Sequence, residues 1–300
     1  MNQPFNNPPG GGAEASFLAG SALYPAPQIC LERGSSSFAA RALDLICPIG
    51  RGQRGLLVAS PGLGKTTLLQ EVCRAVAKGY PEMQIYCLLI DERPEEVTDF
   101  RRNASGAVYA SSLDQPAEQH QAVVAEMMPR AFAAAAAGQH VLILLDSLTR
   151  LTRAFQTQNL DKGRTLSGGL SASALTLPRK IFGAARNVEG QGSITILATI
   201  LVDTGSLMDS IIFEEFKGTG NMELVLSKEL AQQRIYPALD LFKSSTRREE
   251  LFFSDSENVS RQALRAYLSG NRSEPVAAMK NLQKLIDRFP TNRELLAHFA

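Results

Sequence analysis

The chain has 300 residues and a formal net charge of only +1, and 44% of its residues are hydrophobic. This length suits one large domain or two modest ones, and this apolar content can build a sizeable core. The near-neutral balance excludes a surface coated in basic residues, so any contact with nucleic acid must be local.

Cysteine usage and the lack of an expected export signal indicate the cellular compartment, a reducing cytoplasm. The four cysteines are Cys30, Cys47, Cys73 and Cys87, and none are paired at metal-ligand spacing. Cys73 and Cys87 lie in apolar contexts, where buried thiols are the default. The N-terminus has no basic region followed by an apolar run, so no signal peptide is expected. No apolar stretch is long enough to span a bilayer. These features predict a cytoplasmic protein with no membrane partner.

The chain order of the expected elements is that of an α/β fold. Residues 1–35 are rich in Pro, Gly, Asn and Ser and are predicted to form a flexible tail. Continuous apolar strands separated by helices predict a mainly parallel sheet covered on both faces. We expect a core over 36–254 and a helical segment over 255–300 packed on it. The expected helices are 36–44, 65–77, 116–137, 280–289 and 292–299, and the expected strands are 55–59, 84–90, 141–145 and 193–201.

Residues 59–67, ASPGLGKTT, form a phosphate-binding P-loop with Ala59 in place of the usual first glycine. A strand-like run precedes the motif and a helical run follows it, which is the context that the motif requires. Backbone N–H groups of such a loop surround a polyphosphate. Lys65 is expected to reach the outer phosphates and the Thr66 hydroxyl to ligate Mg²⁺. The predicted nucleotide-binding residues here are Gly62, Leu63, Gly64, Lys65, Thr66 and Thr67.

Two later strands end in carboxylates. The strand 141–145 ends in Asp146, a Walker-B pattern that brings a carboxylate beside the Mg²⁺ held by Thr66. Asp146 is expected to contact this Mg²⁺ through a water molecule. The strand 84–90 ends in Asp91-Glu92-Arg93, and Glu92 is the candidate general base. Arg93 would hold that carboxylate or sense phosphate. The alternative is that Asp91 and its neighbours merely cap the next helix.

Arg247 lies in a late basic turn, SSTRREE at 244–250. Such a turn is usually a solvated surface. In a ring of nucleotide motors, however, an arginine from the neighbouring subunit often completes each site and neutralises charge in the transition state.

In this order, the motifs resemble the ATPase half of the bacterial transcription termination factor Rho family, over about residues 31–300. The resemblance implies a RecA-type P-loop NTPase fold, a homohexameric ring, ATP and Mg²⁺ as cofactors, and RNA threaded through the central channel. RNA polymerase is then a candidate partner. The runs that carry the resemblance are PIGRGQRG at 48–55, DERPEEV at 91–97, LLDSLTR at 144–150, FGAARNV at 182–188, DTGS at 203–206 and EEFKGTGNME at 214–223.

The resemblance also assigns roles to single residues. Glu92 is the implied base, Arg93 a site-linking arginine, and Arg247 the arginine finger. Arg234 is implied to be a second interface arginine, and Tyr236 an aromatic that stacks on adenine, unless it is a core aromatic. Two channel loops are implied to contact RNA. Their residues are Lys162, Arg164, Thr165, Ser167, Gly168 and Gly169 in the first loop, and Gly205 and Ser206 in the second.

The chain departs from the family pattern at three points. Leu207 stands where a channel lysine is expected, and Gly62 where the P-loop has a lysine. The family also carries an RNA-binding barrel before this core, which residues 1–30 are too few to form. The first hypothesis is therefore an RNA-dependent ATPase and translocase, an RNA helicase acting in transcription termination. The alternative is a Rho-like ring ATPase with a regulatory or assembly role and no productive RNA translocation.

Overall fold

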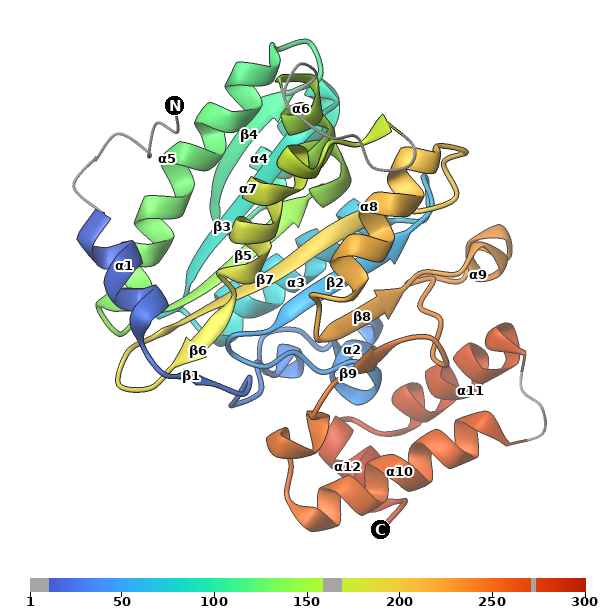
Figure 1. Ribbon diagram of the computed structural model, residues 1–300. Helices are drawn as coiled ribbons and strands as arrows, with labels where there is room; N and C mark the ends of the chain where they lie inside the picture. The colour runs from blue at the N-terminus through green and yellow to red at the C-terminus, as the bar shows by residue number, and fades with distance from the viewer. Residues whose placement is uncertain (1–10, 159–168, 271–273) are drawn as a thin grey trace.

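The computed structural model describes residues 11–158, 169–270 and 274–300. Its centre is a largely parallel sheet (Figure 1), with the strand order β4-β3-β5-β7-β2-β8-β9. Because the six main strands are parallel, their carboxyl ends meet at one edge, which is where ligands bind in such sheets. The parallel strands are β2 (Arg54–Ala59), β3 (Gln84–Glu92), β4 (Ala107–Ser112), β5 (His140–Asp146), β7 (Ser193–Leu201) and β8 (Met222–Val225).

Short antiparallel strands extend the sheet at its borders. β9 (Ser245–Thr246) pairs with β8, while β6 (Arg186–Val188) pairs with β7 and with β1 (Ala22–Leu23). The mixed sheet agrees with the expected α/β class, in which antiparallel strands commonly flank a parallel centre.

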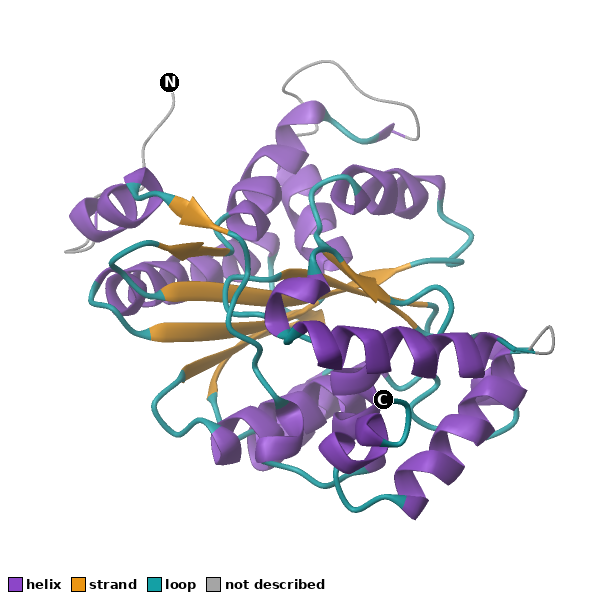
Figure 2. Ribbon diagram, turned by 90° about the horizontal axis from the view of Figure 1, so that it is seen from below, coloured by secondary structure: helices purple, strands orange, loops and turns teal. Residues whose placement is uncertain are grey.

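Helices cover both faces of the sheet, as Figure 2 shows. Alternate side chains of β2 point to opposite faces: Leu57 joins the core with α3, and Leu56 the core on the other face. The helices of the first face are α2 (Phe38–Ile46), α3 (Lys65–Gly79) and α4 (Pro94–Asn103). Those of the second are α1 (Gly11–Ala19), α5 (Ala117–Ala136), α6 (Leu148–Gln158), α7 (Ala172–Gly183) and α8 (Leu207–Lys217).

The C-terminal helices form a group beside α2 in Figure 1 and share its core. The group contains α10 (Asp255–Ser269), α11 (Pro275–Arg288) and α12 (Asn292–Ala297), with α9 (Lys228–Gln232) next to α11. Arg41 of α2 is buried against them: its Nε donates to Asn292 Oδ1 at 3.1 Å and its Nη1 to the Ile286 carbonyl at 2.9 Å. This segment is therefore joined to the core by polar as well as apolar contacts.

The flexible tail expected over 1–35 is wrong for residues 11–35. Phe17 and Ile29 are fully buried, and the Phe17 ring lies 6.1 Å from that of Phe132 on α5. The backbone N–H groups of Leu31 and Glu32 donate to the Asp44 carboxylate at 2.9 and 2.8 Å. A few apolar anchors and one buried carboxylate thus fix a segment whose composition is typical of loops. Residues 1–10 lie outside the described part.

A membrane span was not expected from the sequence. None of the helices in the described ranges is both long and apolar enough to cross a bilayer.

Candidate active site

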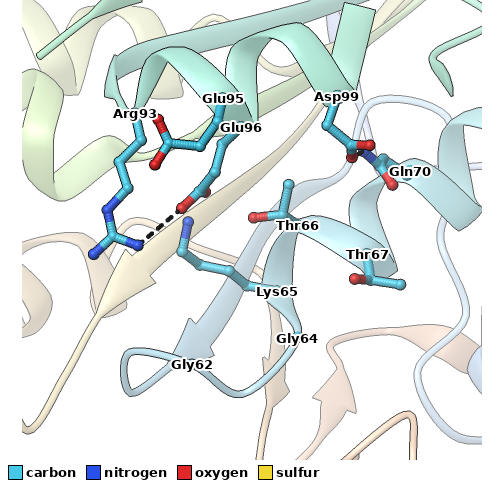
Figure 3. A pocket seen from close by; sticks show the side chains of 10 residues that line it. All are labelled: Gly62, Gly64, Lys65, Thr66, Thr67, Gln70, Arg93, Glu95, Glu96 and Asp99. Atoms are coloured by element: carbon cyan, nitrogen blue, oxygen red, sulfur yellow. Dashed lines mark hydrogen bonds and ion pairs between the residues drawn. The ribbon is translucent and has the colours of Figure 1, made fainter. Parts of the chain in front are cut away.

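The P-loop joins the end of β2 to the start of α3. Gly62 and Gly64 have φ values of +81° and +86°, a conformation that favours glycine, and Gly64 is the N-cap of α3. A pocket of about 460 Å³ opens over this turn. Figure 3 shows Lys65 and Thr66 reaching into it from the first turn of α3. The loop therefore presents a helix N-terminus and a lysine to an anion.

Asp146, at the carboxyl end of β5, is fully buried and is the centre of the site's hydrogen bonds. The Lys65 ammonium donates to Asp146 Oδ1 at 2.6 Å, and the Thr66 hydroxyl to Oδ2 at 3.1 Å. Thr199 of β7 donates a third bond, to Oδ1 at 2.6 Å. The Thr66 hydroxyl and the Asp146 carboxylate are both oxygen donors of the kind Mg²⁺ prefers, so the pair fits this cation.

Glu92 ends the neighbouring strand and is only 2% exposed. Its Oε1 lies 3.4 Å from Lys65 Nζ and 3.4 Å from Arg150 Nε. Burial and the nearby Asp146 carboxylate raise the pKa of Glu92 to about 7, although Lys65 and Arg150 act in the opposite direction. Burial alone would lower the pKa of Lys65, but Asp146 and Glu92 raise it above its usual value. A carboxyl with a pKa near neutrality suits a general base.

The alternative role for this carboxylate cluster, helix capping, does not match the geometry. The N-cap of α4 is Arg93, whose side chain makes no capping bond. Asp91 has a φ of +56°, and its carboxylate lies 3.5 Å from Arg150 Nη1. The Asp91 carbonyl accepts a further hydrogen bond from Arg150. Both carboxylates therefore face α6 rather than the start of α4.

Arg93 lies on the wall of the pocket and does not hold Glu92. It is exposed, and its Nη1 pairs with Glu96 at 3.4 Å (Figure 3). Arg150 occupies the position that we expected Arg93 to take beside the candidate base. The role of Arg93 toward phosphate stays a prediction.

Tyr236 and Arg234 lie near the same edge of the sheet. A Cβ atom on Gly64 would be 3.7 Å from the Tyr236 ring, which is 48% exposed. An aromatic this exposed beside the P-loop does not belong to the core, so the open ring remains available to a flat base. Arg234 is exposed, with a φ of +58°.

Arg247 lies at the opposite edge of the sheet from the P-loop. Thr246 pairs with Met222, and Met222 pairs with Gly55 near the start of β2. The P-loop follows the end of that strand, so about 16 Å of strand separates the two levels. The adjacent Arg248 forms an ion pair with Glu250, with 2.7 Å between Nε and Oε1, and its guanidinium lies over the Tyr24 ring. Arg247 is exposed, and none of the ion pairs found between described residues involves it.

Of the predicted RNA-binding residues, Lys162, Arg164, Thr165, Ser167 and Gly168 lie outside the described residues. Gly169 is exposed, with a φ of +77°. The Gln156 side chain bonds the Gly169 carbonyl at 3.1 Å and the Ser171 N–H at 2.7 Å, which fixes the two ends of this connection together.

The second predicted RNA loop follows β7 and contacts the P-loop directly. Ser60 Oγ donates to Asp203 Oδ2 at 2.8 Å. Gly205 has a φ of +77°, and Ser206 is the N-cap of α8. Leu207 is the first residue of that helix and is 63% exposed. The structure thus brings this loop to the same edge as the nucleotide pocket.

Sequence reasoning missed Arg150, Thr199 and the Ser60–Asp203 bond. Arg150 lies one helical turn after Asp146 within the quoted run LLDSLTR, which signals this end of β5 but not contact with Glu92, since that contact depends on the position of β3. Thr199 is a polar residue inside an otherwise apolar strand, which is a weaker signal.

Comparisons with known proteins agree with this arrangement. Residues 39–246 match the model of the ATP synthase alpha/beta family, nucleotide-binding domain. The chain is 48% identical to transcription termination factor Rho of Haemophilus influenzae, over 91% of this chain and 65% of that protein. It is 47% identical to Rho of Streptomyces coelicolor, over 91% and 66%, and 48% identical to Rho of Micrococcus luteus, over 91% and 39%. The chain therefore spans about two fifths to two thirds of the length of these relatives.

Among solved structures, the fold is shared with a prototypical ATPase of the type III secretion system of pathogenic bacteria. The TM-score is 0.69 at 24% identity, covering 92% of this chain and 84% of that one. This likeness concerns the fold alone.

Proposed function

The chain belongs to the ATP synthase alpha/beta family by its nucleotide-binding domain, and on this premise we propose that it is a Rho-type, RNA-dependent ATPase that acts in transcription termination. The observation that carries the proposal is the convergence of Lys65, Thr66, Asp146 and Glu92 at the carboxyl edge of the sheet, from the ends of β2, β5 and β3. Similarity to Rho along 91% of the chain supports the choice of RNA-dependent chemistry.

Each residue of the site has a defined task in this proposal. Lys65 and the backbone of the P-loop bind the phosphates of ATP. Thr66 and Asp146 would hold Mg²⁺, which when bound would supply positive charge against the phosphates. Glu92 accepts a proton from the attacking water, and Arg150 keeps its carboxylate in place. Tyr236 offers its exposed ring to the adenine.

A second copy of the chain is needed to complete the site. Arg247 is too far from the P-loop of its own chain to reach a nucleotide there. In a closed ring of identical subunits, each Arg247 instead faces the neighbour's site, and Arg234 is a second arginine at that interface. We infer a homohexamer in the cytoplasm with RNA in its channel, contacted by the 162–169 and 203–207 loops. RNA polymerase is a candidate partner.

The alternative is a ring ATPase with a regulatory or assembly role. Leu207 is the feature that favours it, because an exposed leucine in the second loop cannot neutralise a phosphate. The two functions differ in whether RNA raises the rate of ATP turnover.

Substitution of Glu92 tests the catalytic assignment. We expect Glu92→Gln to bind ATP but to lower kcat by about 10²–10⁴-fold, because an amide cannot accept the proton of the water. The matched control is Glu126→Gln on α5, whose carboxylate is exposed and pairs with Arg130 at 3.3 Å. Steady-state turnover together with nucleotide binding distinguishes loss of the base from loss of the site. An unaltered kcat in Glu92→Gln would contradict the assignment.

A further inference from the structure

The chain segment that carries Arg247 is fixed to the core on its N-terminal side. The Thr246 hydroxyl donates to the Pro48 carbonyl at 2.7 Å, and the Arg247 N–H donates to the Asn221 carbonyl at 2.9 Å. The backbone position of Arg247 is therefore defined, while its side chain remains exposed at the surface.

The segment is fixed on its C-terminal side by a different device. Arg248 has a φ of +60° and reverses the chain into the short 3₁₀ helix Glu249–Phe252. Arg265 of α10 donates from Nη2 to both carboxylate oxygens of Glu249, at 3.2 Å each. Arg261 lies one turn earlier on α10, and its Nη2 is 3.5 Å from Glu249 Oε2.

Both arginines are also bonded to the core. Arg261 Nη1 donates to the Asp44 carbonyl at 3.0 Å, and Arg265 donates to the Ile46 carbonyl. The Arg261 side chain is 4% exposed and its guanidinium lies 4.0 Å over the Phe253 ring. Hydrogen bonds to charged groups are stronger than neutral ones, and a buried guanidinium needs a counter-charge. Glu249 supplies that charge: carbonyls at the end of α2 hold the two arginines, and the arginines hold Glu249.

We propose that Glu249, Arg261 and Arg265 form a clamp that positions Arg247 for insertion into the neighbouring subunit's nucleotide site. The inference rests on the proposed function and assigns the C-terminal helices a part in catalysis. Glu249 is a positioning residue: it contacts no nucleotide and acts through Arg247, two residues before it. Anchors on both sides of Arg247 limit the directions in which its side chain can extend, which preorganises it for charge that develops in the transition state.

The test uses Glu249→Gln, with Glu250→Gln as the matched control. Glu250 is adjacent, and within the described residues its carboxylate pairs with the exposed Arg248 alone. An arginine finger is worth about 10³–10⁵-fold in kcat, so misplacement is expected to cost about tenfold or more. We expect Glu249→Gln to lower kcat and kcat/KM together by that factor, with unchanged ATP binding, and Glu250→Gln to stay within about twofold of wild type.

Mixed rings distinguish positioning of Arg247 from a general structural effect. Lys65→Ala and Arg247→Ala subunits serve as the reference pair, each inactive alone and active in mixtures. Glu249→Gln should regain activity when mixed with Lys65→Ala, which supplies an intact finger. It should not regain activity when mixed with Arg247→Ala, since neither of these two subunits has a working finger. If Glu249→Gln rings do not assemble, Glu249→Asp keeps the charge, shortens the side chain and takes the same mixtures.

Four outcomes decide between these roles. Failure of the reference pair in rings known to be mixed would overturn the trans arginine of the proposed function. A second outcome is that the reference pair recovers activity while rings that mix Glu249→Gln with Arg247→Ala recover equally well. That result would overturn the clamp but leave the trans arginine intact. Full turnover in Glu249→Gln would also overturn it. The double variant Arg247→Ala/Glu249→Gln should lose no more kcat than Arg247→Ala alone. That result would support the clamp, because the effects of residues that act as one unit do not add.

Discussion

At the scale of the residue, the site is organised around two buried carboxylates with different partners. Asp146 accepts three hydrogen bonds, from Lys65, Thr66 and Thr199, so both of its oxygens have a partner. Glu92 has only longer contacts, at 3.4 Å, and its pKa is raised to about 7. A carboxylate held by short hydrogen bonds suits a metal ligand, and a buried carboxyl with a raised pKa suits a general base.

The raised pKa of Glu92 gives a pH-dependent prediction in the nucleotide-free protein. The folded state holds a proton on Glu92 to a higher pH than the unfolded chain does, so its contribution to stability is present below about 4.5 and lost as the pH rises to about 7. In urea unfolding, the stability of wild type relative to Glu92→Gln should fall by at most about 3 kcal/mol between about pH 4.5 and about pH 8. A difference that does not change with pH would contradict this environment for Glu92.

The motif residues of the site could be predicted from the sequence, and their supports could not. Lys65, Thr66, Asp146 and Glu92 belong to runs whose spacing encodes their place at strand ends. Thr199 and Arg150 act on these residues from other elements, and that depends on β5 lying between β3 and β7, which no local pattern specifies. The same holds for the separation of Arg247 from the P-loop, which follows from the pairing of β9 with β8.

At the scale of the element, long buried strands were predicted well and short or partly exposed ones were missed. The expected strand 193–201 coincides with β7, and 84–90 falls within β3. β4 and β8 did not emerge, because each has at most six residues and mixed burial, which leaves little periodic signal. The domain boundary near 255 stays a prediction.

The next prediction concerns the junction between the second predicted RNA loop and α8. Leu207 is exposed at the first position of this helix, and Ser60–Asp203 ties the loop to the P-loop. We expect Leu207→Lys to raise RNA-stimulated ATP turnover, since a lysine can bind a phosphate where leucine offers only apolar contact. The control is Val259→Lys on α10, a 61% exposed position far along the chain from both loops.

Two results would count against this reading of Leu207. Unchanged stimulation in intact Leu207→Lys rings would mean that the loop does not touch RNA in this protein. Rings that dissociate on the substitution would instead indicate that Leu207 packs in a protein–protein contact. Ring size measured alongside turnover separates these cases.

At the scale of the whole molecule, the nucleotide pocket and the proposed arginine finger lie at opposite edges of one sheet. The pocket lined by Lys65 lies at the carboxyl edge, where β3 also ends in Glu92, and Arg247 with its proposed clamp lies at the amino edge. In the proposed function, a monomer therefore carries both parts but cannot bring its own Arg247 to its own pocket. Assembly in a closed ring would bring each pocket to a neighbour's arginine, and would arrange the loops after β7 around a common axis.

The most direct measurement of the central claim is ATP turnover by assembled rings with and without single-stranded RNA, poly(C) or poly(U). We predict a severalfold increase with RNA, abolished in Lys65→Ala and smaller with poly(dC), because contacts to 2′-hydroxyls distinguish RNA from DNA. The increase should weaken with added salt, since phosphate contacts carry the binding. An identical rate at saturating RNA in intact, ATP-hydrolysing rings would contradict an RNA-dependent motor and favour the regulatory or assembly role.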